Sequence, residues 1–342
     1  MQKRLSPGKL LDEQGNLTEA GYVTSLVKEY SRSQVKASAL RIKEWDYYLI
    51  HNQRFGIALT VADNSYMGLV SISFLDFCNG TEVTKSPMLL LPLGRLHMPK
   101  TSETGDVRVG GKGWKFSFEN QGDRRILRAS MDDFSQGKPI RMKIELDGEP
   151  EDSMVIATPF DRQRTFYYNQ KIIGMRARGA VEFQGRHWVF EPGDSWGLLD
   201  WGRGVWTYSN TWYWSAMMGK VQGHTLGFNL GYGFGVNENA TENMLFYDGK
   251  AHKLEKVNFQ IPGEKEENPH FLEPWIFSSS DERVQLTFTP LLDRKAYTSA
   301  GVILSDQHQV FGCFDGRVIL DSGEEIPVEH MLGFAEKVRN KW

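Results

Sequence analysis

The segment at residues 227–237 alternates so regularly between large apolar residues and small or polar ones that it constrains this part of the chain to an extended strand. Its apolar members are Phe228, Leu230, Tyr232, Phe234 and Val236, and glycine or asparagine fills every other position. Successive residues of a strand point to opposite faces, so one face here is apolar and the other nearly bare. A bare face indicates a bend, or a neighbouring tryptophan or a ligand that approaches the backbone.

Turn signals recur along the whole chain and separate many short segments of the same alternating kind. The clearest are Asn79-Gly80, Asp147-Gly148, Asp248-Gly249 and Asp315-Gly316. Short strands joined by such pairs, in a chain with 34 glycines, are typical of an all-β barrel or sandwich. Two helical exceptions are predicted. One runs from Thr18, a suitable N-cap, to about Arg32, and a shorter one lies near Glu329–Val338.

Composition limits the partners and the compartment of the protein. With 40 basic and 43 acidic residues the net charge is −3, which leaves no overall electrostatic attraction for nucleic acid or an acidic membrane. No apolar stretch approaches 18 residues, so no membrane-spanning helix is expected. The start, Met1 to Lys9, lacks the apolar run of a signal peptide, and Cys78 and Cys313 form no CxxC motif. These features predict a soluble, cytoplasmic protein.

The two halves of the sequence echo one another in a preserved order. Trp45-Asp46-Tyr47-Tyr48 before an apolar strand corresponds to Trp212-Tyr213-Trp214 before another, and Trp114-Lys115-Phe116-Ser117 corresponds to Trp275-Ile276-Phe277-Ser278. The echo suggests two related β-units with a junction near residues 185–196. Pockets tend to form where such units meet, so a ligand site is expected at or near the junction.

Six of the ten tryptophans fall within 27 residues. They are Trp188, Trp196, Trp201, Trp206, Trp212 and Trp214. Asp200 and Arg203 lie among them. Aromatic faces attract cations, and apolar walls raise the pKa of an acid, so this cluster can line a ligand pocket. The alternative is an aromatic-rich core that holds a structural Asp–Arg pair.

Residues 166–214 resemble a calycin-like family of double barrels that includes carotenoid 1,2-hydratases, AttH-type proteins and, more distantly, tocopherol cyclases. The similarity rests on Phe166-Tyr167-Tyr168-Asn169, Gly193-x-x-Trp196, Asp200-Trp201-Gly202 and Trp212-x-Trp214. The resemblance implies two lipocalin-like barrels end to end. It also implies that Asp200 matches an aspartate implicated in protonating an isoprenoid double bond. The sequence departs from the pattern at Trp201, where relatives have histidine, and at Asn169, where they have serine.

Over its whole length the chain is more similar to a bacterial and fungal family known as domain of unknown function 2804. Residues 43–48 (Lys-Glu-Trp-Asp-Tyr-Tyr), the segment from Asp200 to Trp206 and the tail Gly333-Phe334-Ala335-Glu336 carry this resemblance. The predicted architecture is therefore all-β, with two consecutive calycin-like antiparallel barrels. An N-terminal arm with one helix covers residues 1–40, the first barrel 41–190, and the second barrel 191–342 with a short C-terminal helix.

The first functional hypothesis is a cofactor-free enzyme that acts by acid catalysis on a hydrophobic, isoprenoid- or polyketide-like substrate, as a hydratase, cyclase or isomerase. Asp200 would be the acid, and Arg203 would either anchor an anionic group of the ligand or pair with Asp200 and hold it ionised. The predicted ligand-binding residues are Tyr168, Trp196, Trp201, Trp206, Tyr208, Trp212 and Trp214. Within one strand Trp212 and Trp214 must share a face.

Two other functions stay open. The same pocket suits a non-catalytic binding protein for a lipid-like ligand, and tryptophan platforms also suit the sugars of a carbohydrate-active enzyme. No metal site is expected, because the eight histidines show neither HxH nor HExxH spacing. A nucleotide site is disfavoured because no GxxxxGK motif is present.

Overall fold

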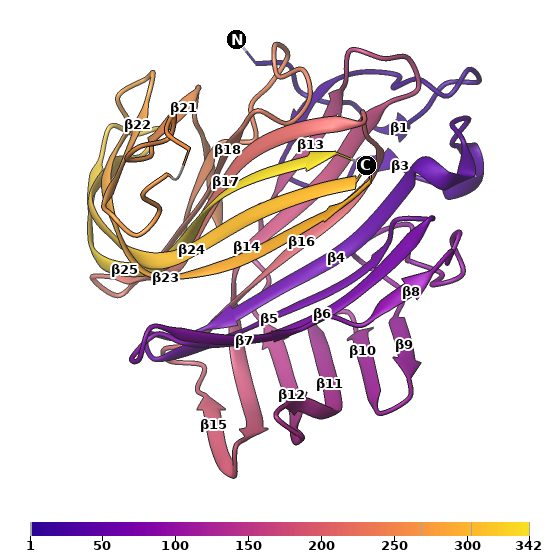
Figure 1. The fold of residues 1–342 in the computed structure, drawn as a ribbon. Coiled ribbons are helices and arrows are strands. Elements are labelled where there is room, and N and C mark those ends of the chain that lie inside the picture. The colour runs from indigo at the N-terminus through magenta and orange to yellow at the C-terminus, as the bar shows by residue number, and fades with distance from the viewer. Residues whose placement is uncertain (1, 268, 302, 342) are drawn as a thin grey trace.

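The protein is all-β in a computed structural model, which describes residues 2–267, 269–301 and 303–341. Two curled antiparallel sheets follow one another along the chain and lie against each other (Figure 1). A small parallel pair, β1 (Gly8–Lys9) and β3 (Lys28–Glu29), and two 3₁₀ turns, η1 (Arg32–Gln34) and η2 (Ala39–Arg41), belong to the N-terminal arm.

The first sheet has a main path of hydrogen-bonded strands with short strands attached to it. Its order is β7 (Thr81–Lys85), β6 (Met67–Asp76), β5 (Phe55–Asp63), β4 (Ile42–His51), β16 (Trp196–Val205), β14 (Phe166–Phe183), β12 (Lys138–Asp147), β11 (Arg124–Ser135), β10 (Trp114–Asn120) and β9 (Val107–Gly111). The attached strands are β13 (Met154–Pro159) and β15 (Arg186–Phe190) on β14, β8 (Met88–Leu90) on β6, and β2 (Gly21–Val23) on β13.

The second sheet repeats the strand connectivity of the first. Its order is β20 (Lys250–Lys253), β19 (Met244–Tyr247), β18 (His224–Tyr232), β17 (Ser209–Val221), β25 (Glu325–Lys341), β24 (Ile303–Ile319), β23 (Val284–Ala300), β22 (Trp275–Ser279) and β21 (Val257–Gln260). In each sheet a meander of four strands comes first, and the last long strand returns to pair with the first strand of the meander, β16 with β4 and β25 with β17. Since β16 belongs to the first sheet, that sheet extends to Val205. The domain limits at residues 40 and 190 stay a prediction.

The N-terminal helix predicted from Thr18 to Arg32 is not present, and no α-helix occurs in the described residues. The backbone of that segment instead forms hydrogen bonds with other parts of the chain. Strand β2 pairs with β13, the N–H of Tyr22 donates to the carbonyl of Lys3, and the N–H of Leu5 donates to the carbonyl of Tyr22. The helix predicted near Glu329–Val338 is also wrong, because these residues lie in β25 between β17 and β24. A short apolar run that is buried on both faces has no periodicity that separates helix from strand.

The strand predicted over 227–237 is shorter than expected and ends at Tyr232 as β18. Gly233 and Gly235 follow it with φ of 88° and 76°, in the left-handed region that only glycine adopts readily. The bare face of β18 lies against other parts of the chain. A Cβ atom at Gly227 would lie 2.8 Å from the Ile173 side chain of the first sheet, and one at Gly231 would lie 2.6 Å from Oε1 of Glu242. Gly227 therefore lets the two sheets approach closely, and Gly231 leaves room for the Glu242 side chain.

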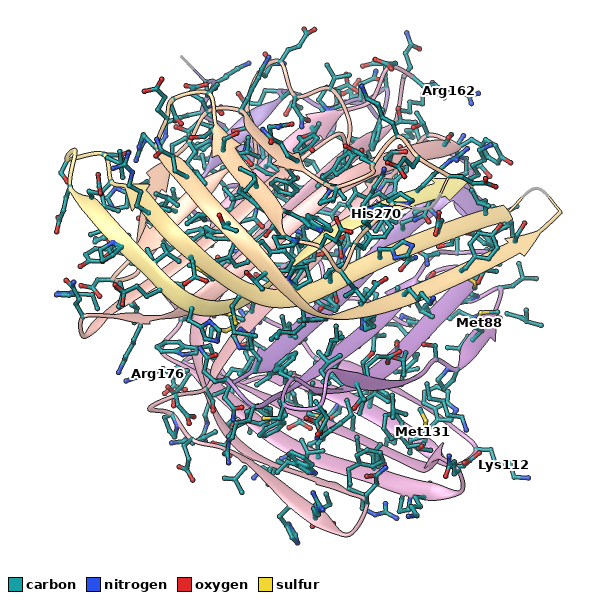
Figure 2. All side chains as sticks on the ribbon, turned by 60° about the vertical axis from the view of Figure 1, so that its left-hand side comes forward. Met88, Lys112, Met131, Arg162, Arg176 and His270 are labelled. Atoms are coloured by element: carbon teal, nitrogen blue, oxygen red, sulfur yellow. The ribbon has the colours of Figure 1, made fainter. Side chains whose placement is uncertain are left out.

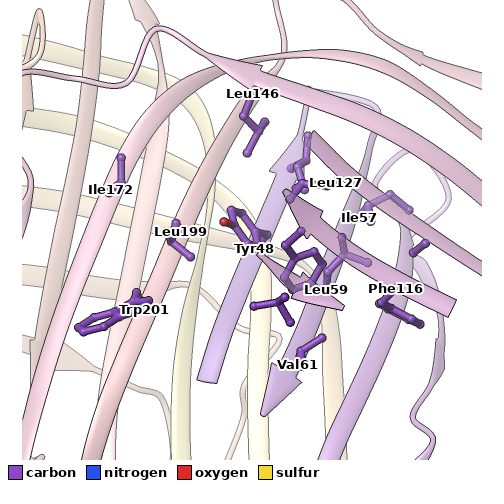
Figure 3. Packing of buried hydrophobic residues seen from close by; sticks show 14 of the residues in the cluster. Tyr48, Ile57, Leu59, Val61, Phe116, Leu127, Leu146, Ile172, Leu199 and Trp201 are labelled. Atoms are coloured by element: carbon purple, nitrogen blue, oxygen red, sulfur yellow. The ribbon is translucent and has the colours of Figure 1, made fainter. Parts of the chain in front are cut away.

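Buried apolar side chains form three clusters. One lies inside the curl of the first sheet and includes Tyr48, Leu127 and Trp201 (Figure 3). Another lies inside the second sheet, and the third lies between the sheets. Alternation along β16 divides its side chains, because Trp201 points into the first sheet while Leu198 points to the seam between the sheets. The seam is therefore lined by the outward faces of strands whose inward faces form the two cores.

The described residues include no helix with the length and apolar character needed to cross a bilayer.

Candidate functional site

A pocket of about 190 Å³ lies in the seam between the two sheets. Both sheets contribute to its wall, and aromatic rings make up much of it. The lining residues are Trp45, Tyr47, Thr60, Ala62, Asn64, Leu69, Tyr167, Lys171, Asp200, Trp206, Trp212, Trp214, Phe234, Glu242, Arg294, Gln307, Gln309, Glu336 and Asn340. A ring-sized ligand fits such a volume, since cavities of roughly 150 Å³ accept benzene.

The aromatic part of the wall is a continuous set of ring contacts. Trp206 makes edge-on contacts with Trp45 at 5.1 Å, with Trp212 at 6.0 Å and with Phe234 at 4.8 Å between ring centroids. Tyr167 stacks on Trp45 at 5.7 Å. Rings in edge-to-face contact hold one another in place, so this wall is rigid and leaves the pocket beside it.

Asp200 lies at the floor of the pocket and accepts three hydrogen bonds. Its Oδ1 lies 2.9 Å from Nζ of Lys171 and 2.6 Å from Nδ2 of Asn169, and its Oδ2 lies 3.1 Å from Nε1 of Trp45. The ammonium of Lys171 also lies 3.8 Å from the centroid of the Trp214 ring. Both charged side chains are buried, so this ion pair is a fixed part of the wall and Asp200 acts in it as an acceptor.

Glycine at position 202 makes this arrangement sterically feasible. A Cβ atom there would clash with the indole of Trp45, which lies across the β16 backbone to reach Asp200. The Asp-Trp-Gly sequence thus puts a carboxylate toward the pocket, an indole toward the core of the first sheet and an open space for a second indole. The local sequence fixes the geometry of the floor.

Glu336 is the second carboxyl group of the pocket and comes from β25 of the second sheet. Its Oε1 accepts a hydrogen bond from Nε1 of Trp212 at 2.8 Å, and its Oε2 accepts one from Nε2 of Gln309 at 3.0 Å. Gln309 in turn accepts a bond from the hydroxyl of Tyr47. Burial raises the pKa of Glu336 from 4.5 to about 7, although the hydrogen bond from Trp212 and the charge of Lys171 oppose the shift. A carboxyl group with this pKa exchanges its proton near neutral pH.

A third carboxyl group, that of Glu242, closes the opposite side. Asn229 joins it to the aromatic wall, because Nδ2 of Asn229 lies 3.3 Å from Oε2 of Glu242 while its Oδ1 accepts a bond of 2.7 Å from Nε1 of Trp214. Burial raises the pKa of Glu242, and the nearby Lys171 opposes this. The pocket thus gathers three carboxyl groups around one buried ammonium.

One buried donor of the pocket has no protein acceptor. Asn340 is fully buried, and its Oδ1 accepts a hydrogen bond of 2.8 Å from Ser305, while its Nδ2 has no partner among the described residues. Leaving a buried amide donor unpaired costs about 1–3 kcal/mol. An oxygen atom of a bound molecule would satisfy this donor.

The structure brings four of the sequence-predicted site residues to the pocket: Asp200, Trp206, Trp212 and Trp214. Trp196 is buried between the sheets without lining the pocket. Tyr208 is 49% exposed and lies outside it. The placements of Asp200, Trp212 and Trp214 follow the alternation of β16 and β17, in which even-numbered side chains face the seam, whereas Trp206 and Tyr208 lie in the segment between the two strands.

Arg203, Trp201 and Tyr168 point into the first sheet instead. Arg203 takes neither of the two positions considered from the sequence. It lies 3.1 Å from Oδ1 of Asp46, donates to the carbonyl oxygens of Trp45, Pro99 and Gly202, and is fully buried. It follows Asp200 by three positions, an odd spacing that puts the two side chains on opposite faces of β16.

Trp201 and Tyr168 contact each other edge to face in the same core, with ring centroids 5.7 Å apart. Tyr168 donates from its hydroxyl to the carbonyl of Lys28 and so fastens the N-terminal arm. Both residues are therefore part of the packing of the first sheet.

Sequence reasoning missed the polar half of the pocket. Lys171 is the single charged residue of the buried run 166–173 in β14, and Glu336 is the single charged residue of the buried run 331–336 in β25, which is the signal that singles them out. Glu242 stands in a polar stretch that is typical of a turn, and Asn340 carries no local signal. The described residues hold no group of three or more histidine, cysteine, aspartate or glutamate side chains placed to bind a metal ion.

Comparison with known proteins gives a family and a fold. The family described as "Domain of unknown function (DUF2804)" matches residues 2–342. No curated protein matches the sequence. An AttH-like protein from Nitrosomonas europaea has a similar structure, with a TM-score of 0.55 and 13% identity over 90% of this chain and 96% of that one. Kievitone hydratase from Nectria haematococca gives 0.49 and 9% identity over 98% of both chains. The protein CghA gives 0.43 and 12% identity over 98% of this chain and 97% of that one.

Proposed function

The chain belongs to the DUF2804 family, whose description names no activity, and from the geometry of the pocket we propose that it is a small-molecule enzyme that transfers protons to an unsaturated, mainly apolar ligand. The observation that carries the proposal is the Glu336 carboxyl group, which is buried beside tryptophan rings with its pKa raised to about 7. General acids work best when their pKa lies near the operating pH.

In the proposed reaction Glu336 donates its proton to a carbon atom of a double bond, which leaves the carboxylate on the enzyme and a carbocation on the ligand. The face of Trp212 stabilises this cation, at about 1–2 kcal/mol for a desolvated ring. The Trp214 ring already carries the Lys171 ammonium. Loss of a proton to Glu336 completes an isomerisation or cyclisation, and attack by water with release of a proton to the same carboxylate completes a hydration. Either route restores the enzyme.

The acid role expected of Asp200 passes to Glu336 in this proposal. Asp200 holds the Lys171 ammonium against Trp214, so it positions a fixed positive charge. That charge favours a polar oxygen on the ligand, and the unpaired Nδ2 of Asn340 would donate to the same kind of atom. The ligand class is therefore a ring or isoprene-sized unit with an oxygen substituent.

A non-catalytic binding protein for a lipid-like ligand is the second candidate. One observation favours it: both oxygens of Glu336 already accept hydrogen bonds, from Trp212 and Gln309, so the group resembles a structural member of the wall. In that case the pocket recognises the same ligand without changing it.

The two functions separate in a deuterium-exchange experiment. The molecule that co-purifies with the protein is recovered by solvent extraction, identified by mass spectrometry and incubated in D₂O with the wild type and with Glu336→Gln. With the wild type we expect the ligand to gain deuterium at carbon. With Glu336→Gln we expect the ligand to bind, which quenches the tryptophan fluorescence, but to gain no deuterium. Exchange at the wild-type rate in Glu336→Gln excludes this acid. Binding without exchange in the wild type selects the second candidate.

A further inference from the structure

An unusually apolar surface segment lies beside Leu69, a residue of the pocket lining. Residues 88–93 read Met-Leu-Leu-Leu-Pro-Leu, and four of their side chains are exposed to solvent. Leu90 is 84% exposed and Met88 62%, with Leu91 and Leu93 also exposed. Single exposed leucines are common on proteins, but a contiguous group marks a binding surface. We call residues 88–93 the leucine edge.

The leucine edge is continuous with the pocket. Leu69 lines the pocket and lies opposite Met88 in the β6–β8 pair, while Met67 lies opposite Leu90. Directly opposed residues of an antiparallel pair point to the same face of the sheet. An apolar strip therefore runs from the pocket wall at Leu69 to the rim of the first sheet. In Figure 1, β8 lies at the right-hand rim of that sheet, and in Figure 2 Met88 lies at the periphery of the molecule.

The chain holds these leucines outward in a costly conformation. Leu91 and Leu93 have φ of 48° and 51°, in the left-handed region that L-residues other than asparagine, aspartate and glycine avoid. The segment is tied down rather than loose, because the N–H groups of both leucines donate to the 65–66 turn and the Arg95 guanidinium donates to the carbonyls of Leu91 and Pro92. Strain that is not repaid by burial indicates a functional surface.

The charges around the leucine edge fit an anionic surface. No aspartate or glutamate occurs from residue 83 to residue 102, whereas Arg95 and Lys100 do, in a chain with a net charge of −3. A third basic residue of this stretch, Lys85, is paired with Asp133. Apolar side chains that protrude between basic residues are typical of segments that enter the interface of a bilayer. A symmetric dimer instead needs a self-complementary patch, which a protruding rim does not provide.

We propose that the leucine edge docks on a lipid bilayer that contains anionic lipids and that the pocket receives its ligand from that bilayer along the Leu69–Met88 strip. The second half of this statement rests on the proposed function, while the docking itself does not. Leu90 and Leu91 enter the apolar layer, and Lys100 stays at the headgroups. The ligand then moves from the acyl chains to the pocket without crossing water.

Vesicle sedimentation tests the docking. The full chain is mixed with vesicles of phosphatidylcholine and phosphatidylglycerol, and with vesicles of phosphatidylcholine alone. We expect binding that is tighter to the mixed vesicles and that weakens by about tenfold or more in the double variant Leu90→Ser, Leu91→Ser, because two exposed apolar side chains are lost. Lys100→Gln should weaken binding to the mixed vesicles only.

The matched control is Leu272→Ser with Ile276→Ser, two exposed apolar residues of the second sheet region, and it should bind as the wild type does. Glu336→Gln should also bind vesicles normally, so failure of the proposed chemistry leaves this result intact. Absence of vesicle binding, or equal binding by the Leu90/Leu91 variant, overturns the proposal. If the protein binds no vesicles and light scattering gives the mass of a dimer, the leucine edge contacts a second copy of the chain, and this result also overturns the proposal.

Discussion

Lys171 and Asp200 form a buried ion pair, with Nζ 2.9 Å from Oδ1, that joins β14 to β16 on the face turned toward the second sheet. Among the described residues that line the pocket, Lys171 and Arg294 are the basic ones and Asp200, Glu242 and Glu336 the acidic ones, so the pair sets part of the charge balance of the site. Breaking it from one side leaves the other charge buried without its partner.

Replacing Asp200 with asparagine should destabilise the fold by about 3–5 kcal/mol, because the buried Lys171 ammonium loses its counter-charge. The free energy of unfolding in urea measures this effect. A second change, Lys171→Met, should recover most of the loss in the double variant, since an apolar side chain has no charge to solvate. The exposed pair Lys85–Asp133 supplies the control, and Asp133→Asn should leave stability unchanged. Equal effects of the two aspartate variants would contradict the buried-pair assignment.

The stability contributed by Glu336 should depend on pH. Its pKa is raised from 4.5 to about 7 in the folded protein, so between these values the folded state holds a proton that the unfolded state has released. Stability therefore falls as pH rises from 4.5 to 7, by roughly 3 kcal/mol for this group. The difference in unfolding free energy between the wild type and Glu336→Gln, followed from pH 4.5 to 8, should trace this loss. In the control variant Glu329→Gln, which changes an exposed residue, the unfolding free energy should vary with pH as it does in the wild type.

His51 should have the opposite effect at lower pH. It is buried in β4, and burial lowers its pKa from 6.5 to about 4. Below pH 6.5 the imidazole binds a proton in the unfolded chain but stays neutral in the folded chain. The contribution of His51 to stability is therefore complete above pH 6.5 and is lost as pH falls toward 4, by roughly 3 kcal/mol. Thermal unfolding of His51→Gln should show less acid sensitivity than the wild type. His187, which is exposed, gives the comparison variant His187→Gln, and an identical acid response in both variants would refute the role of His51.

Gly202→Ala should displace the Trp45 indole from Asp200, because the new methyl group would occupy the space of the ring. Overpacking of this kind costs about 1–3 kcal/mol. The unfolding free energy and the tryptophan emission spectrum should both change. Gly193→Ala is the matched control, since nothing lies within 4 Å of a Cβ atom there. An unchanged Gly202→Ala protein would mean that Trp45 does not need this position.

The all-β fold was predictable because alternation and turn pairs act locally, within a few residues. Asp248-Gly249 does join β19 to β20, and Asn79-Gly80 does lie between β6 and β7. Asp315-Gly316 differs: it lies within β24 at a register shift, where the same residue types serve a bulge. The echo of Trp45 in Trp212 matches two equivalent strands, β4 and β17. Trp114 and Trp275 do not lie in equivalent strands. Trp114 lies in β10, whereas Trp275 lies in β22, which has the position in the second sheet that β11 has in the first.

The site was predictable only where one strand supplies it. Alternation along β16 and β17 places Asp200, Trp212 and Trp214, and the same rule separates Arg203 from Asp200. The partners Lys171 and Glu336 come from β14 and β25, and their approach depends on strand order and register across two sheets, which no local pattern encodes. The leucine edge was hidden for another reason: a net charge averages over the chain and conceals a stretch of residues 83–102 that carries no acid.

Each strand that faces the seam divides its residues between two tasks, with one set holding a hydrophobic interior and the alternate set holding the pocket. A substitution at a seam position therefore leaves both interiors intact, and a substitution in either interior leaves the pocket chemistry in place. Such a layout allows ligand preference to diverge between relatives by exchange of single outward-facing side chains, while the scaffold that displays them stays constant.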